Sequence, residues 1–273
     1  MEVKKYPIEH WSYSSLVTYL RNPLAWYKRY VEGVYDMPSN PASVIGRAAH
    51  TALEYFYKGS TAEEATMHGL VYLRSVPNTE IEFGKAESTR ARKWKRSKME
   101  EEYRRAISFY LSKPPRHKVL GVEVKALAFI PGIEVPIKAV SDLVVKSRVN
   151  PEEVDIIDHK FVDSYKALAV DNPLFMIQAL FNYYTVLEIF QRPVGRFIVY
   201  ECKKRKNKDG RPQLRRYVIN FREREEEFSL FHRLLKDATK EIRGRKMFLP
   251  NPTDMFDGKN SLEVYRARLV ESL

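Results

Sequence analysis

The middle of this 273-residue chain contains three successive segments with the composition of β-strands, and they limit the possible folds more than any other feature. HKVLGVEVKALAFI and IEVPIKAVSDLVV are joined at Pro131-Gly132, a typical turn pair, and EVDIIDHKFV follows them. Asn172-Pro173 then opens an apolar helical segment, LFMIQALFNYYTVLEIF. Two further strand-like segments, VGRFIVYECKK and QLRRYVINF, are joined by a hairpin around Lys208-Asp209-Gly210. This order predicts an α/β fold with a mixed central β-sheet flanked by helices.

Two aspartates occur within these apolar strands, where an unpaired carboxylate is costly. Asp142 should end the second strand, and Asp158 in the third strand is followed two residues later by Lys160. Because residues two apart in a strand point to one face, roughly 7 Å apart, Asp158 and Lys160 should project together with Val154 and Ile156. A single acid at a strand end is most often a cap or an ion-pair partner. Two on successive strands, with a lysine nearby, indicate a site for a divalent cation and a phosphate.

An upstream helix, GRAAHTALEYF, places His50 and Glu54 four residues apart and therefore on one face. Gly46 should allow another chain segment to approach closely, and Arg47 lies one turn before His50. Gln178 is a polar residue on the apolar helix that follows Lys160. Each of these residues alone is more often structural than catalytic, as with a half-buried, hydrogen-bonded histidine. Their order along the chain is what indicates a site.

The composition narrows the class of partner. The formal net charge is +12 and the sequence pI is near 9.5, which suits a polyanion such as nucleic acid or an anionic membrane surface. Cys202 is the only cysteine, so an internal disulfide framework and multi-cysteine metal sites are excluded. No segment approaches the ~20 apolar residues of a membrane span, and the first residues lack a secretory apolar stretch. A cytoplasmic or intracellular protein without a membrane partner is expected.

The amino-terminal region is aromatic and basic. We expect its first helix to begin after Ser14 or Ser15, to be interrupted at Asn22-Pro23, and to resume through WYKRYV. Its rings either pack into the core, which we favour, or stack on unpaired bases beside the interleaved cations. The rings concerned are Trp11, Tyr13, Tyr19, Trp26, Tyr27 and Tyr30.

Residues 60–115 form a charged segment, which we predict to be a helical insertion within a single domain of residues 1–273. The second half, GKAESTRARKWKRSKMEEEYRRAISFYL, contains no helix breaker and should be one long helix. Its basic run is either a solvated face or a surface that guides a nucleic-acid strand. That run comprises Arg90, Arg92, Lys93, Lys95, Arg96 and Lys98. A final charged helix should extend from about Arg222 to Lys246.

The motifs follow a recognisable order: GxxxH with a glutamate four residues later, a strand with an aspartate, D-x-K on the next strand, and a glutamine on the following helix. This order resembles the RecB-like branch of the PD-(D/E)XK nuclease superfamily, over nearly the whole chain. SSLVTYLRNPLAWYKRY and FLPNPTD resemble segments that, in RecB-like and CRISPR-adaptation nucleases, lie beside iron–sulfur cysteines. Here Asn22 replaces the first of those cysteines and none follows Cys202, so the ligand count excludes an iron–sulfur cluster.

The resemblance implies a restriction-endonuclease-like core with a helical amino-terminal region and a helical insertion. It implies a Mg²⁺- or Mn²⁺-dependent DNA nuclease, an exonuclease acting on DNA ends or single-stranded DNA. Two positions depart from the family pattern: Ala139 replaces a common glycine, and Asn182 stands where tyrosine is usual, with Tyr183 beside it.

The resemblance also implies a role for individual residues. The implied metal ligands are His50, Asp142, Asp158 and the backbone carbonyl of His159, and the implied catalytic residues are Asp142, Asp158, Lys160 and Gln178. Glu54 and, more weakly, Glu123 would orient His50 or a bound water. Nucleic-acid contacts are assigned to Arg47, Tyr183, Arg92, Lys93, Lys95 and Arg96.

A different class of protein remains open: a nucleic-acid-binding or recombination scaffold that keeps the fold but has an inert site. A helicase or recombination partner would fit either interpretation. The sequence leaves open the polarity of cleavage, exonuclease against endonuclease action, tolerance of RNA, the biological pathway and the oligomeric state.

Overall fold

A mixed sheet forms the centre of the molecule, as the sequence predicts, and its six strands are the five predicted segments with the short strand Trp11–Ser12 added. The computed structural model describes residues 5–34, 38–85, 88–164, 173–205, 214–245 and 247–251. Antiparallel β2 pairs along one edge of β3, while β1 (parallel) and β4 (antiparallel) pair with the two ends of the other edge. β5 then pairs parallel to β4, and β6 pairs antiparallel to β5. The strands are β1 (Trp11–Ser12), β2 (Val119–Ala128), β3 (Ile137–Lys146), β4 (Val154–Val162), β5 (Val194–Lys203) and β6 (Leu214–Asn220).

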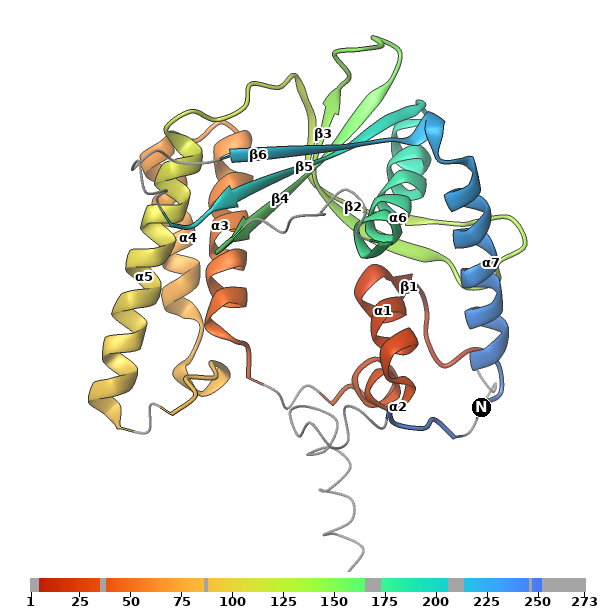
Figure 1. Cartoon of the computed structure of the whole chain (residues 1–273), viewed down its shortest axis with the longest axis horizontal. Coiled ribbons are helices and arrows are strands. Elements are labelled where there is room, and N and C mark those ends of the chain that lie inside the picture. The colour runs from red at the N-terminus through yellow and green to blue at the C-terminus, as the bar shows by residue number, and fades with distance from the viewer. Residues whose placement is uncertain are drawn as a thin grey trace, which may run out of the picture.

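Helices cover both faces of this sheet and form two groups, which Figure 1 shows on opposite sides of the strands. One group contains α3 (Pro41–Tyr57), α4 (Ala62–Ser75) and α5 (Thr89–Leu111). The other contains α1 (Tyr13–Arg21), α2 (Pro23–Trp26), the π-helical turn Tyr27–Val31, α6 (Pro173–Phe190) and α7 (Glu225–Ile242). Short 3₁₀ turns at Asn78–Glu80 and Phe221–Glu223 complete the described elements.

The alternation of side chains along the strands divides the interior into two cores. Val144 and Ile156 pack with α1, α6 and α7, whereas their neighbours Leu143 and Ile157 pack with α3, α4 and α5. Because successive strand residues point to opposite faces and both faces are covered, β3 and β4 contain uninterrupted apolar stretches, Leu143-Val144-Val145 and Ile156-Ile157. This explains why they could be recognised as buried strands in the sequence.

The amino-terminal rings belong to the core, which confirms the favoured interpretation for the three that are buried, Trp11, Tyr19 and Trp26. Trp11 Nε1 donates to Thr239 Oγ1 of α7 at 2.9 Å, and Trp26 Nε1 donates to Ser15 Oγ at 2.8 Å. These contacts attach α1 and α2 to the α6–α7 side of the sheet.

The sequence predicts which segments are helices better than it predicts the residues at which the helices begin and end. The first helix begins at Tyr13 and not after Ser14 or Ser15, because Ser12 is extended and its side chain accepts the Ser15 N–H. The break at Asn22 is confirmed, since Asn22 caps α2 through Ala25 N–H.

The other long helices also fall within their predicted segments. α5 is confirmed from Thr89, whereas the last helix is shorter than predicted and spans Glu225–Ile242. The predicted hairpin at 208–210 lies outside the described residues. Among the helices that are described, none combines the length and apolarity required to cross a bilayer.

The close approach of α3 and α4 occurs at Gly69, not at Gly46 as the sequence suggested. A Cβ on Gly69 would lie 2.1 Å from Tyr103 Oη and 2.4 Å from the Ala48 carbonyl oxygen, whereas a Cβ on Gly46 meets no atom within 4 Å. Tyr103 Oη is itself fixed, because it donates to the Thr66 carbonyl at 2.8 Å. Gly69 is therefore the residue that lets α3, which carries His50, lie against α4.

We predict that Gly69→Ala lowers the free energy of unfolding by about 1–3 kcal/mol, because the added methyl forces α3, α4 and Tyr103 apart. Gly46→Ala is the matched control in the neighbouring helix. It should be neutral or raise stability by about 0.5–1 kcal/mol, since alanine favours the helix. Urea unfolding of both variants measures the difference, and equal effects would contradict the packing argument.

Candidate metal centre and nuclease site

The site lies where β3 and β4 separate. Their pairing ends at Leu143 and Ile157, so Asp142 and Asp158 are the next residue of each strand. The backbone N–H of His159 donates to Asp142 Oδ2 at 2.7 Å, so a side-chain carboxylate replaces the backbone carbonyl that would accept this hydrogen bond in a continued strand pair. The expectation that Asp142 ends its strand is therefore wrong, whereas Asp158 lies inside its strand as predicted, and both occur at the point where pairing between the strands is lost.

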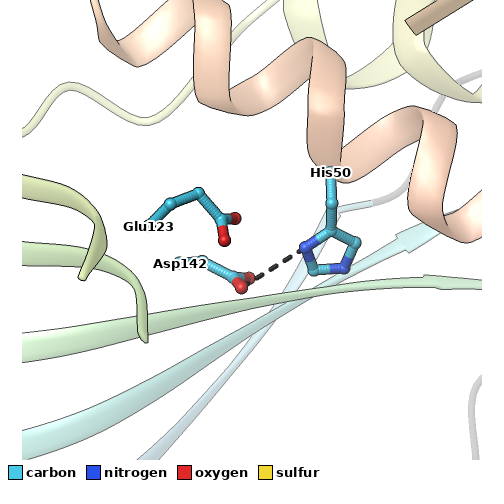
Figure 2. Close-up of side chains that lie close together, drawn as sticks. All are labelled: His50, Glu123 and Asp142. Atoms are coloured by element: carbon cyan, nitrogen blue, oxygen red, sulfur yellow. Dashed lines mark ion pairs between the residues drawn. The ribbon is translucent and has the colours of Figure 1, made fainter. Parts of the chain in front are cut away.

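Three metal-binding side chains meet at this point. His50 comes from α3, Glu123 from β2 and Asp142 from β3, and a potential ligand atom of each lies within 4.8 Å of the others. Figure 2 shows the two carboxylates beside each other and the imidazole directed toward Asp142, with His50 Nδ1 3.3 Å from Asp142 Oδ1. Ligands of one octahedral Mg²⁺, each at about 2.1 Å, lie about 3.0 Å apart when adjacent and about 4.2 Å apart when opposite, so the side chains would move inward by roughly 1 Å to share one ion.

Glu123 reaches the site because its backbone is unusual. Its φ of 49° lies in the left-handed region, which side chains other than glycine rarely adopt. The register pairs Val122 with Leu143 and Val124 with Ser141, which leaves Glu123 opposite Asp142. As a result Val122 and Val124 pack on opposite faces of the sheet, although residues two apart normally share a face.

Asp158 is held by two side chains of different elements. Its Oδ1 accepts Gln178 Nε2 of α6 at 2.8 Å and Lys160 Nζ at 2.9 Å. Its buried Oδ2 lies 2.8 Å from Lys160 Nζ but accepts no well-aligned hydrogen bond among the described residues. This oxygen thus retains an acceptor position that a cation could use, which suits a divalent metal.

The His159 side chain supports Asp142 from the face of the sheet that α3 and α5 cover. The ring is buried, its Nδ1 lies 3.3 Å from Asp142 Oδ2, and its Nε2 is 2.8 Å from Tyr110 Oη. Tyr110 Oη in turn contacts Tyr57 Oη at 2.8 Å. Sequence reasoning used only the carbonyl of this residue and missed the imidazole, because nothing in the sequence relates His159 to Tyr110 of a distant helix.

The charges of the centre are strongly coupled. Burial alone would raise the pKa of the Asp142 carboxyl, but the imidazoles of His50 and His159 hold it well below its usual range. Burial would lower the pKa of His50, and the Asp142 carboxylate outweighs this and raises it to about 9. Burial, with Asp142 nearby, raises the pKa of Glu123 to about 7.

The pKa values of Asp158 and Lys160 reflect the same competition between burial, which disfavours a charge, and attraction to a neighbouring opposite charge. Burial raises the pKa of Asp158 above its ordinary value, while Lys160 opposes the increase. Burial would lower the pKa of Lys160, but the neighbouring carboxylates, Asp158 first, keep it above its ordinary value. In the metal-free protein Lys160 is therefore an ammonium group near neutral pH.

Other residues predicted from the sequence lie farther from this centre or are bound elsewhere. Glu54 forms an ion pair with Lys58 at 2.5 Å, and Arg47 donates to Ser39 Oγ at 2.9 Å. Tyr183 packs edge-on against Phe221 and Phe228 in an aromatic cluster. The position four residues after Gln178 is filled by buried Asn182, which accepts Ser141 Oγ and donates to the Gln178 carbonyl.

The basic run occupies the amino-terminal half of α5, far from the centre. At 1.5 Å per residue, Arg92 lies about 27 Å and Lys98, the last residue of the run, about 18 Å along the helix from Tyr110, which contacts the centre through His159. Lys95 Nζ donates to the Phe83 carbonyl, and Arg96 donates to the Val76 carbonyl. Both therefore fix the loop between α4 and α5. Nucleic-acid contacts by Arg92 and Lys93 remain a prediction.

Comparisons with known proteins agree with this geometry. A family model described as the PD-(D/E)XK nuclease superfamily matches residues 10–255. This chain belongs to that superfamily. No curated protein in the comparison matches the sequence.

Two solved structures are similar to this PD-(D/E)XK protein. One is a candidate exonuclease from Eubacterium rectale, with a TM-score of 0.58 and 10% identity over 89% of this chain and 84% of that chain. The other, SSO0001, has a TM-score of 0.31 and 14% identity over 84% and 83% of the two chains, a score too low to compare the folds. The first likeness supports the nuclease fold, and PD-(D/E)XK nucleases use divalent metals.

We predict that metal binding releases protons. His50, with its pKa of about 9, must lose its proton to become a ligand, and below about pH 7 Glu123 must lose one as well. Affinity for Mn²⁺ should therefore rise about tenfold per pH unit between pH 7 and 9, and more steeply below pH 7. Calorimetric titration at pH 8 in buffers of different ionisation enthalpy counts the protons, and a count of zero would contradict this ligand set.

We also predict that Glu123→Gly raises the free energy of unfolding but lowers the affinity for the metal. Glycine relieves the left-handed backbone, worth roughly 1 kcal/mol, and removes a carboxyl whose raised pKa makes the folded state less stable as pH rises from 4.5 through about 7. The gain in free energy of unfolding should thus be larger at pH 8 than at pH 5, while affinity for Mn²⁺ falls by roughly 10–100-fold.

Gln191→Gly supplies the control for that variant, because Gln191 has a similar φ of 50° outside the site. It should gain stability equally at both pH values and bind Mn²⁺ like the wild type. If Glu123→Gly retains full affinity for Mn²⁺, then Glu123 is not a ligand.

Proposed function

We propose that this protein is a Mg²⁺- or Mn²⁺-dependent deoxyribonuclease, acting as an exonuclease on DNA ends or single-stranded DNA. The observation that carries the proposal is the contact of Asp158 with both Lys160 and Gln178, directly beside the cluster of His50, Glu123 and Asp142. Membership of the PD-(D/E)XK superfamily supports nuclease activity, and the net charge of +12 supports a polyanionic substrate.

His50, Asp142 and Asp158 would hold the metal, and we add Glu123 to this set because its carboxylate lies within the cluster. The backbone carbonyl of His159 remains a predicted ligand. A bound Mg²⁺ or Mn²⁺ supplies a Lewis acid for the phosphate and a lowered pKa for a ligand water. The His159 imidazole keeps the Asp142 carboxylate in place, since it contacts the Oδ2 atom and is itself fixed by Tyr110.

Lys160 would stabilise negative charge on the phosphate as the attacking water adds. Its raised pKa makes it a cation near neutral pH, so we favour charge stabilisation over removal of a proton from the water. Gln178 fixes Asp158 through Oδ1, which leaves Oδ2 oriented for the cation. Glu54 is bound to Lys58, so a role in orienting His50 would require that ion pair to open.

Action on DNA ends agrees with the printed name of the Eubacterium rectale protein, although that likeness extends to the fold alone. A helicase or recombination partner stays a prediction. The competing proposal is a nucleic-acid-binding scaffold with an inert site. It differs in expecting DNA binding without metal-dependent cleavage.

We predict that end-labelled linear DNA is degraded with Mn²⁺ or Mg²⁺ but not with EDTA. Lys160→Ala and Asp158→Ala should each lower the rate by at least about 100–1000-fold, because each removes a charge placed at the reacting phosphate. Gln178→Ala should cost less, since Lys160 still holds Asp158. The label at each end reports polarity, and circular single-stranded DNA separates exonuclease from endonuclease action.

Exposed residues of the same types provide the controls. Glu152→Ala, in the turn between β3 and β4, and Lys236→Ala on α7 should keep wild-type rates. Binding of DNA by the wild type without cleavage under either metal would replace the nuclease proposal with the scaffold.

A further inference from the structure

A cavity of about 410 Å³ is lined by Gln178 of α6, which also contacts Asp158. Three basic side chains line it: His10, just before β1, Lys125 of β2 and Lys138 of β3. Hydroxyl groups of Ser12 and Ser14 add hydrogen-bonding atoms, and none of the described residues that line the cavity is acidic. Its volume falls within the roughly 300–1,000 Å³ of pockets that hold small ligands, enough for a phosphate with part of its sugar.

The two lysines are positioned as a pair without a counter-ion. The register places Lys125 opposite Val140 and Lys138 opposite Leu127, so both project from the same face of β2 and β3, on diagonal positions. Lys125 is exposed and Lys138 is half-buried. Among the described residues neither forms an ion pair, whereas Lys160 pairs with Asp158. Two adjacent cations without an acid suit an anionic ligand.

His10 adds an imidazole that can exchange hydrogen bonds with a ligand in the cavity. Burial, followed by the charge of Lys138, lowers the pKa of this imidazole, an effect that the neighbouring Glu9 partly offsets and Lys125 reinforces. The imidazole is thus neutral, and the positive charge of the cavity comes from the two lysines. An anion between the lysines would remove the repulsion between them.

The cavity and the metal centre share a wall. Gln178 lines the cavity and also donates to Asp158 Oδ1 at 2.8 Å. Asn182, one turn later on α6, lines it too and donates to the Gln178 carbonyl at 2.9 Å. Tyr13, a third lining residue, lies close enough to Lys160 and Asp158 for their charges to act on it. A group bound in the cavity would therefore lie next to the reacting bond.

Among the described strands, none pairs with the middle of this edge of β3. β1 pairs with Ile137 and Lys138, β4 pairs from Leu143 onward, and residues 139–142 lie between them. Ala139 and Val140 of this stretch line the cavity, and Asp142 at its end belongs to the metal centre. The cavity and the centre therefore lie along one short segment of β3.

We propose that this cavity is a phosphate subsite, in which Lys125, Lys138 and His10 hold a phosphate of the substrate strand next to the bond being cut. The subsite rests on the proposed nuclease function, which it deepens by naming the groups that position the strand. The ligand chemistry is a nucleic-acid phosphate, which is either an internal phosphodiester or the phosphate monoester at a strand end.

The test is binding of a fluorescent single-stranded decanucleotide in EDTA, measured by anisotropy at several salt concentrations. Lys125→Ala/Lys138→Ala should raise Kd at least tenfold at low salt. The slope of log K against log salt should become shallower by about 0.7, the value for loss of one phosphate contact on a single strand. Lys125→Arg/Lys138→Arg, which keeps both charges, should lose much less.

The control is Lys236→Ala/Lys240→Ala on α7, which removes the same charge from exposed positions outside the cavity. It should leave Kd and the salt slope close to wild type. An equal loss in the control would overturn the subsite, because bulk charge would then explain the effect. Unchanged binding by the cavity variant would overturn it as well. Thermal unfolding checks that all variants are folded.

Oligonucleotides with a 5′-phosphate, a 3′-phosphate or no terminal phosphate distinguish the two ligand sources. If a terminal phosphate strengthens wild-type binding and the cavity variant loses that advantage, the subsite holds a strand end. If the variant loses the same factor with all three, it holds an internal phosphodiester. These binding measurements need no hydrolysis, so they test the subsite separately from the nuclease activity. If the wild type does not cleave DNA but the cavity variant loses binding, the nuclease proposal fails and the subsite is supported. If the wild type cleaves DNA but the cavity variant binds normally, the subsite fails and the nuclease proposal is supported.

Discussion

The early end of pairing between β3 and β4 is the constraint on which the site depends. Had the two strands continued side by side beyond Leu143 and Ile157, Asp142 and Asp158 would have faced one another as an ordinary cross-strand pair with like charges. Instead the strands separate, and Asp142 Oδ2 takes the backbone N–H of His159. One carboxylate thereby satisfies a backbone group of the next strand with Oδ2 and contacts the His50 imidazole with Oδ1.

Both helical layers are needed to complete this centre. The α3 layer supplies His50 and, through Tyr110, the support for His159, whereas the α6 layer supplies Gln178 to Asp158. The two apolar cores therefore fix the distance between functional groups as well as the fold, since a shift of either layer would move one group relative to the others. The glycine contact between α3 and α4 belongs to the same requirement.

The sequence predicted the features that follow from the local pattern of residues, such as the faces of the strands. It missed the features that depend on an unusual backbone conformation or on tertiary packing. Strand alternation correctly placed Asp158 and Lys160 on the face of Val154 and Ile156. Glu123 was given only a supporting role, because a left-handed φ at a glutamate in a strand has no sequence signal. The sequence suggested a close approach of another segment at Gly46, but the close approach is at Gly69, because a glycine in the sequence does not show whether a neighbouring segment packs against it. Lys95 and Arg96 looked like a solvated face, yet bind loop carbonyls that only the packing of α4 and α5 brings near.

The distribution of charge relates the two parts of this region. Carboxylates gather at the separation of β3 and β4, where burial raises the pKa of Glu123 and Asp158 and makes the metal-free arrangement costly. Lys125 and Lys138, which form no ion pair among the described residues, line the cavity that Gln178 also lines. A cation on the carboxylates and a phosphate on the lysines would each relieve a repulsion that the folded chain maintains. The proposed ligand, a phosphodiester strand bound with a divalent metal, would satisfy both sets at once, because it carries successive phosphates.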